Sequence, residues 1–163
     1  MAYDLIFICA RCESEGVNVL EICSCDKNSN VFIEAYRPLL PVVKKLMDCG
    51  IKVSQAVSKW YLESDAGCIK GFLNITLFLH GDYEDINWNL PKLFYSCVDL
   101  TKAWGSKETT PISVHGNYAD EQYGYFICLQ ESTSNPKSLE KKSIKSLCAW
   151  AESLSADEIK LQL

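Results

Sequence analysis

The chain has 163 residues, of which 48% are hydrophobic and 23% are charged, and its formal net charge is −5 at pH 7. This length suits one domain with a sizeable core, and the composition excludes a disordered chain. The acidic balance argues against a nucleic-acid-binding protein, which normally carries a basic surface. The N-terminus has no basic residue before its first short apolar run, and no apolar stretch is long enough for a membrane helix. We therefore expect a cytoplasmic protein without nucleic-acid or membrane partners.

Hydrophobic periodicity and turn residues predict the order of the secondary-structure elements. The expected elements are strands at 3–12, 17–25 and 31–36, helices at 37–49 and 54–64, a strand at 72–79, a helix at 89–104, strands at 111–115 and 123–130, and a helix at 137–153 with a short helical tail from 156. Because strands follow one another in runs rather than alternating with helices, the pattern favours an α+β fold. We expect a single α+β domain over residues 1–163, with a mostly antiparallel sheet that starts as an N-terminal β-meander and is packed by about three to four helices.

Nine cysteines are present, and without a signal peptide we expect reduced thiols that act as small apolar residues. Cys9-x2-Cys12 and Cys23-x-Cys25 together have the residue types of a tetrahedral zinc site. The expected hairpin argues against such a site, because a strand places Cys9 and Cys12 on opposite faces and the two pairs at different heights. We therefore expect no metal and no cofactor, with metal binding by these four cysteines as the less favoured alternative.

Both histidines of the chain lie in similar short segments, His80-Gly-Asp-Tyr-Glu-Asp85 and His115-Gly-Asn-Tyr-Ala-Asp120. Each is expected to follow a strand and open a loop, which is where sites are often built. Two histidines with two aspartates suit a divalent metal or acid–base catalysis on a phosphodiester. A chance recurrence of strand-end turn residues is the competing explanation, since the chain has no motif of a nucleophilic or nucleotide-binding enzyme.

Two further segments combine carboxylates with aromatic rings and have no basic residue. The candidate partner-binding residues are Asp82, Tyr83, Glu84, Asp85, Trp88, Tyr118, Asp120, Glu121 and Tyr123. In a protein interface, rings supply buried area and carboxylates steer a basic partner. Two ordinary polar loops, with tyrosines covering the core, would show the same composition.

Three hypotheses for function follow from these features. The first is a protein-binding inhibitor of the immunity or antitoxin type, which occludes the active site of a basic, nuclease-like toxin. The second is a small hydrolase or metal-dependent phosphoesterase that uses His80 and His115. The third is a structural or oligomerising domain without a ligand. We favour the inhibitor, because its acidic loops match a basic protein partner and catalytic motifs are missing from the sequence.

Overall fold

The computed structural model describes residues 4–18, 22–25, 32–98 and 124–162. Its elements in chain order are β1 (Leu5–Cys9), β2 (Glu15–Gly16), β3 (Phe32–Tyr36), the 3-10 helix η2 (Arg37–Leu39), α1 (Leu40–Asp48), β4 (Val53–Asp65), β5 (Cys68–His80), β6 (Tyr95–Val98), β7 (Gly124–Thr133), α4 (Pro136–Ser153) and α5 (Ala156–Lys160). Among the described helices, none is long and apolar enough to cross a membrane.

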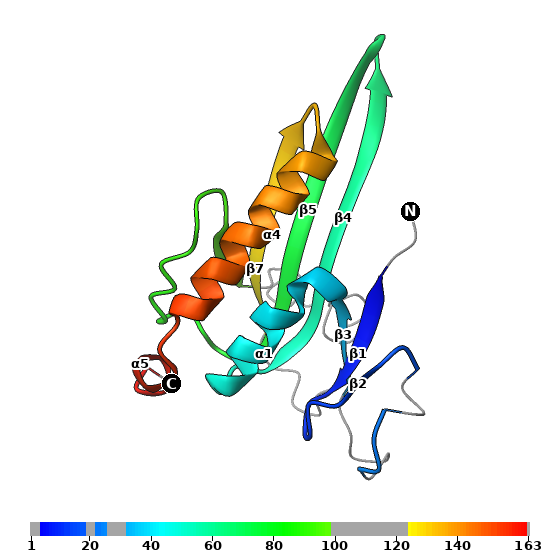
Figure 1. The fold of residues 1–163 in the computed structure, drawn as a ribbon. Coiled ribbons are helices and arrows are strands. Elements are labelled where there is room, and N and C mark those ends of the chain that lie inside the picture. Colours follow the sequence, from blue (N-terminus) through cyan, green and yellow to red (C-terminus); the bar gives the residue numbers. More distant parts are fainter. Residues whose placement is uncertain (1–3, 19–21, 26–31, 99–123, 163) are drawn as a thin grey trace, which may run out of the picture.

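A seven-stranded sheet with the order β2-β1-β3-β4-β5-β7-β6 organises the molecule. All strand pairs are antiparallel except β3 and β4, which run parallel and are joined by η2 and α1. In Figure 1, α1 and α4 lie together on one face of this sheet. The α+β class and the mostly antiparallel sheet are therefore confirmed. The predicted N-terminal β-meander is wrong, because β1 lies between β2 and β3 and these two strands do not pair. The described α-helices number three, fewer than the sequence predicted.

The core lies between the two helices and the sheet. The strands β3, β5 and β7 and the helix α4 direct apolar side chains into this core. Four of these side chains have no exposed surface: Ile33, Leu77, Leu129 and Leu147. Three contacts fix α4 over the sheet. Glu140 accepts hydrogen bonds from the hydroxyl groups of Ser58 on β4 (2.7 Å) and Tyr36 on β3 (3.2 Å). The third is the Trp150 indole, which donates to the Trp88 carbonyl at 2.7 Å.

The longest elements are β4 and β5, two strands of 13 residues each that form one hairpin. Its turn holds Ala66 at φ 48° and Gly67 at φ 81°, the two positive values that a type I′ hairpin turn requires. β3 pairs with β4 only up to Ala56, and β7 pairs with β5 only up to Gly71. The end of the hairpin, residues 63–65 and 68–70 with the turn between them, therefore projects past both neighbours as a short two-stranded arm (Figure 1).

The helix predicted at 54–64 is wrong, because this segment is β4. Its apolar residues have helical spacing, but pairing of 12 residues with β5 decides the outcome, and all residues from 53 to 58 are buried in the sheet. The helix predicted at 89–104 is also wrong over its described part, where Tyr95–Val98 forms β6 beside β7. Strand 17–25 is replaced by the two-residue β2, and strand 111–115 lies outside the described residues.

Candidate metal centre

Strand β1 ends at Cys9 because the chain turns sharply there. The Glu13 amide donates to the Cys9 carbonyl, and the Cys9 amide donates to the Ser14 carbonyl, both at 2.9 Å. Glu13 adopts a positive φ of 58°, as residues in tight turns often do. Cys9 and Cys12 therefore sit in one closed turn, which allows both sulfur atoms to point to the same place.

Residues 22–25 return to this turn after β2. Glu15 of β2 forms an ion pair with Lys44 of α1, which ties the short strand to the helix layer. Ile22 is buried and packs against Gly16, where a Cβ atom would lie 3.0 Å from its Cγ1. Because Gly16 has no side chain, Ile22 can lie close to its backbone. Cys23 and Cys25 follow directly and face the Cys9–Cys12 turn.

The sulfur atoms of Cys9, Cys12, Cys23 and Cys25 all lie within 4.8 Å of one another. In a tetrahedral zinc site with Zn–S bonds of about 2.3 Å, the ligand sulfurs are roughly 3.8 Å apart. The four thiols therefore need only a small contraction to enclose a zinc ion. Of the nine cysteines, these four alone gather in this way among the described residues.

Hydrogen bonds prepare the cluster for a charged sulfur. The Ser14 hydroxyl, 3.1 Å from the Cys12 sulfur, and then the Ser14 backbone lower the pKa of Cys12 to about 6. The pKa of Cys25 is raised to about 12, mainly by the hydrogen bond of its thiol to Cys12 and to a smaller extent by the one to Cys23. The lowered pKa of Cys12 favours its thiolate, which is the form of cysteine that binds a metal ion.

The expectation that these cysteines lie apart is wrong, and the cause is the register of the hairpin. We assumed a long strand after Gly16, which would place Cys23 opposite Ile6. Instead, β2 covers only Glu15 and Gly16, and the other neighbour of β1 is β3. The Cys-x2-Cys spacing was itself the correct signal, whereas the Ser14 hydroxyl had no sequence signature.

The predicted partner-binding loop after β5 divides into exposed and buried residues. Asp82, Glu84 and Asp85 are exposed, whereas Tyr83 and Trp88 are each only 5% exposed. A partner would therefore meet the three carboxylates and not these two rings. The remaining predicted residues, Tyr118, Asp120, Glu121 and Tyr123, lie outside the described part of the chain.

An aromatic cluster holds this loop against the core. The Tyr83 hydroxyl donates to the His80 carbonyl at 2.9 Å and accepts from the Lys52 amide at 3.1 Å. Its ring meets Trp88 and Tyr125 edge to face, with centroids 6.3 and 6.1 Å apart. The loop backbone is consequently fixed, and its carboxylates are presented from a rigid support.

His80 ends β5 and is 5% exposed, so its imidazole lies inside the molecule rather than in an open cleft. His115 lies outside the described residues, and the proposed convergence of the two histidines stays a prediction.

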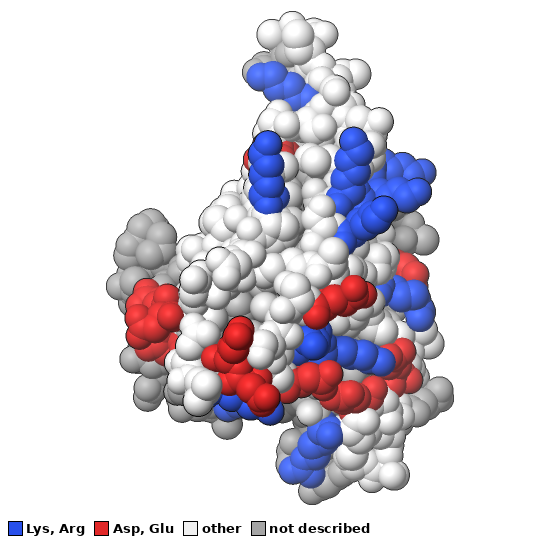
Figure 2. Space-filling view, turned by 60° about the vertical axis from the view of Figure 1, so that its left-hand side comes forward, with Lys and Arg blue, Asp and Glu red and all other residues white. Residues whose placement is uncertain are grey.

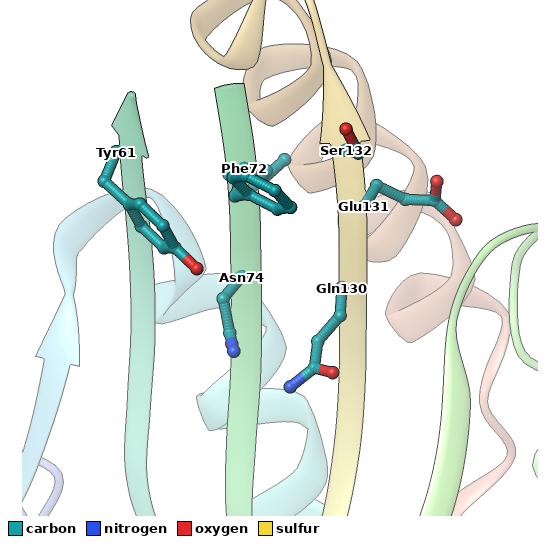
Figure 3. Close-up of a pocket in the computed structure, with 7 residues that line it drawn as sticks. Tyr61, Phe72, Asn74, Gln130, Glu131 and Ser132 are labelled. Atoms are coloured by element: carbon teal, nitrogen blue, oxygen red, sulfur yellow. The ribbon is translucent and has the colours of Figure 1, made fainter. Parts of the chain in front are cut away.

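A shallow pocket of about 270 Å³ lies on the sheet face opposite the helices. Figure 3 shows Tyr61, Phe72, Asn74, Gln130 and Ser132 around it, with the Glu131 carboxylate directed away. The Tyr61 and Phe72 rings stack with centroids 5.3 Å apart. Its lining offers the amide groups of Asn74 and Gln130 and the hydroxyl groups of Tyr61 and Ser132.

The distribution of charge is uneven over the face seen in Figure 2. In the upper part of the view most charged side chains are basic, whereas acidic side chains gather in the lower half with basic ones among them. Four exposed lysines of α4, Lys137, Lys141, Lys142 and Lys145, and Lys70 on the arm contribute to the basic part of the molecule. The net negative charge is therefore not spread evenly.

No family model, curated protein or solved structure matches this chain.

Proposed function

We propose that the chain is a zinc-binding protein whose ion is held by Cys9, Cys12, Cys23 and Cys25. The observation that supports this proposal is the convergence of four sulfur atoms within 4.8 Å from two segments of the chain. Few metals other than zinc bind thiolate sulfur in proteins. A set of four cysteines favours zinc or an iron–sulfur centre.

The role of the ion would be structural. Four protein ligands fill the tetrahedral coordination sphere and leave no position for water or substrate. The ion would fasten residues 22–25 to the end of β1, where a two-residue strand gives little backbone pairing. Ser14 and backbone amides near the sulfurs would act as hydrogen-bond donors to the bound thiolates.

The test is metal content and ligand identity in protein purified under reducing conditions. We expect one zinc per chain by native mass spectrometry, and a Co²⁺-substituted form with the visible spectrum of a tetrahedral tetrathiolate centre. Cys12→Ser and Cys25→Ser should each lose the metal. Cys68→Ser and Cys148→Ser, which change thiols outside the cluster, should keep it. A metal-free chain whose four thiols are reduced would contradict the proposal. So would a metal-free chain whose mass is lower by four hydrogens, because its four thiols have formed two disulfides.

We also propose, as a second function, the protein-binding inhibitor of a basic toxin that the sequence favours. Its support is the set of three exposed carboxylates, Asp82, Glu84 and Asp85, on a loop anchored by buried aromatic rings. Rigid presentation lowers the entropy lost on binding, and carboxylates accelerate encounter with a basic surface.

The second function is tested by recovering proteins bound to the tagged chain from its own cells. We expect a stoichiometric basic partner whose binding weakens steeply with salt and is lost in the triple variant Asp82→Asn, Glu84→Gln, Asp85→Asn. The control is the variant Asp157→Asn, Glu158→Gln, which removes carboxylates from α5. Equal binding by both variants would exclude a role for the loop.

A further inference from the structure

The outer edge of β4 is long and carries no described strand beyond Ala56. From Val57 to Asp65 the strand pairs on one side with β5, and its other side presents backbone amides and carbonyls. Edges of this length normally carry a bulge, a proline, inward charges or charged side chains that discourage pairing with another chain, and the charges of this edge, Lys59 and Glu63, are opposite in sign. This stretch has no proline, and the bulge of β4 lies outside it, between Val53 and Gln55.

The side chains on this edge are chemically self-complementary. Residues 58–64 read Ser-Lys-Trp-Tyr-Leu-Glu-Ser, and the pattern is symmetric about Tyr61. An antiparallel pairing of two copies centred on Tyr61 places Lys59 opposite Glu63 of the second copy, and Trp60 opposite Leu62. Ser58 then meets Ser64, and the two Tyr61 residues meet at the centre. The unpaired stretch, residues 57–65, has the same midpoint as this pattern.

We propose that the chain binds a second copy of itself through β4, in an antiparallel strand pair with its two-fold axis at Tyr61. The two sheets join into one, and both helix layers lie on the same side. The interface is isologous, because each residue meets its complement twice. This inference is independent of the zinc site and of the acidic loop.

Charge is complementary in this register. Lys59, Tyr61 and Glu63 share one face of β4, since side chains alternate along a strand. Both charged residues are exposed, and among the described side chains neither forms an ion pair. Within the hairpin, Glu63 lies opposite Lys70 of β5. In the dimer Glu63 would stand between Lys70 and the second Lys59, which gives a ladder of alternating sign.

The exposed apolar residues of this edge also find a partner in this arrangement. Leu62 is 58% exposed and Tyr61 is 50% exposed. Trp60 and Leu62 lie on the helix side of β4, as does Ser58, which bonds to Glu140 of α4. Pairing of Trp60 with the second Leu62 covers both from water on that side.

The experiment compares charge reversals that keep or break the symmetry. Sedimentation equilibrium of the full chain should show a dimer. Lys59→Glu or Glu63→Lys should each raise the dissociation constant of this dimer roughly ten-fold or more, because each variant places two like-charged pairs in the interface. The double variant Lys59→Glu, Glu63→Lys should restore dimerisation. A mixture of the two single variants should form a heterodimer, in which every pair is again opposite in sign.

Lys145→Glu, on exposed α4, is the matched charge reversal outside the edge and should leave the dimer unchanged. Hydrogen exchange should report slower exchange of amides in residues 57–65 as concentration rises. Far-UV circular dichroism establishes that each variant is folded. A monomer at all concentrations, or a dimer that ignores both single reversals, would overturn the proposal. So would failure of the double variant and the mixture to associate, because the register centred on Tyr61 requires both.

Discussion

Ser58 shows how a single polar residue fixes the position of α4. Its hydroxyl group is 2% exposed and donates to Glu140, whose second oxygen accepts from Tyr36. One carboxylate of α4 thereby binds two neighbouring strands, β3 and β4, that lie far from α4 in the sequence. A buried hydroxyl that loses its acceptor costs more than the hydrogen bond itself contributed, because water does not replace the partner.

Glu140→Ala should lower the free energy of unfolding by about 1–3 kcal/mol, since it leaves the Ser58 hydroxyl without its acceptor. Glu140→Gln keeps an oxygen at the same position and should lose less. Urea unfolding followed by circular dichroism measures both. Equal stability of the alanine variant and the native chain would show that the Ser58 hydroxyl finds another acceptor.

At the scale of elements, the joint between α4 and the hairpin arm depends on close backbone approach. At Gly71 an added Cβ would lie 2.5 Å from the Thr133 carbonyl oxygen and 2.8 Å from Pro136 Cγ. Thr133 ends β7 and Pro136 begins α4, so Gly71 lies where the strand passes into the helix. The small residue at this position thus lets the helix start directly over the sheet.

Gly71→Ala should destabilise the fold by about 1–3 kcal/mol, because the backbone must move apart to admit a methyl group. Thermal unfolding measures the change, and Ser132→Ala, at an exposed position of β7 outside the proposed interface, is the control with an expected change within about 0.5 kcal/mol. Unchanged stability of the glycine variant would mean that β7 and α4 shift without cost.

The sequence predicted those elements whose pattern is local. β3, β5, β7, α1 and α4 follow from β-branched runs, a proline at the start of a helix and regular apolar spacing. β4 was misassigned because its apolar residues satisfy both periods, and only its partner β5 decides between them. The cysteine cluster was identified by residue type and then set aside, because its geometry depends on where β2 ends. Such long-range pairing is not encoded in any short window of sequence.

At the scale of the whole molecule, the proposed zinc site lies at one end of the core. The cluster is at the end of β1, which contributes Ile6 and Ile8 to the core, whereas most core residues belong to β3, β4, β5, β7, α1 and α4. Most of the buried apolar surface therefore does not involve the four sulfurs. The metal should therefore add stability to an already folded domain rather than decide whether it folds.

Removal of zinc with a chelator should lower the thermal midpoint while leaving the far-UV circular dichroism at room temperature nearly unchanged. Hydrogen exchange should speed up in the segments around residues 9–16 and 22–25, and stay slow in β5 and α4. Complete unfolding on chelation would show instead that the metal supports the entire sheet. Re-addition of zinc is the control, and it should restore the midpoint.

The position of α4 near the C-terminal end has a consequence for synthesis of the chain. The contacts of Glu140 with Ser58 and of Trp150 with Trp88 span 82 and 62 residues. At ribosomal rates of about 5–20 residues per second, several seconds pass between the appearance of β5 and that of α4. During this interval the apolar face that α4 will cover has no partner from its own chain. A nascent chain paused before Pro136 consequently exposes apolar sheet surface that the finished domain buries under α4.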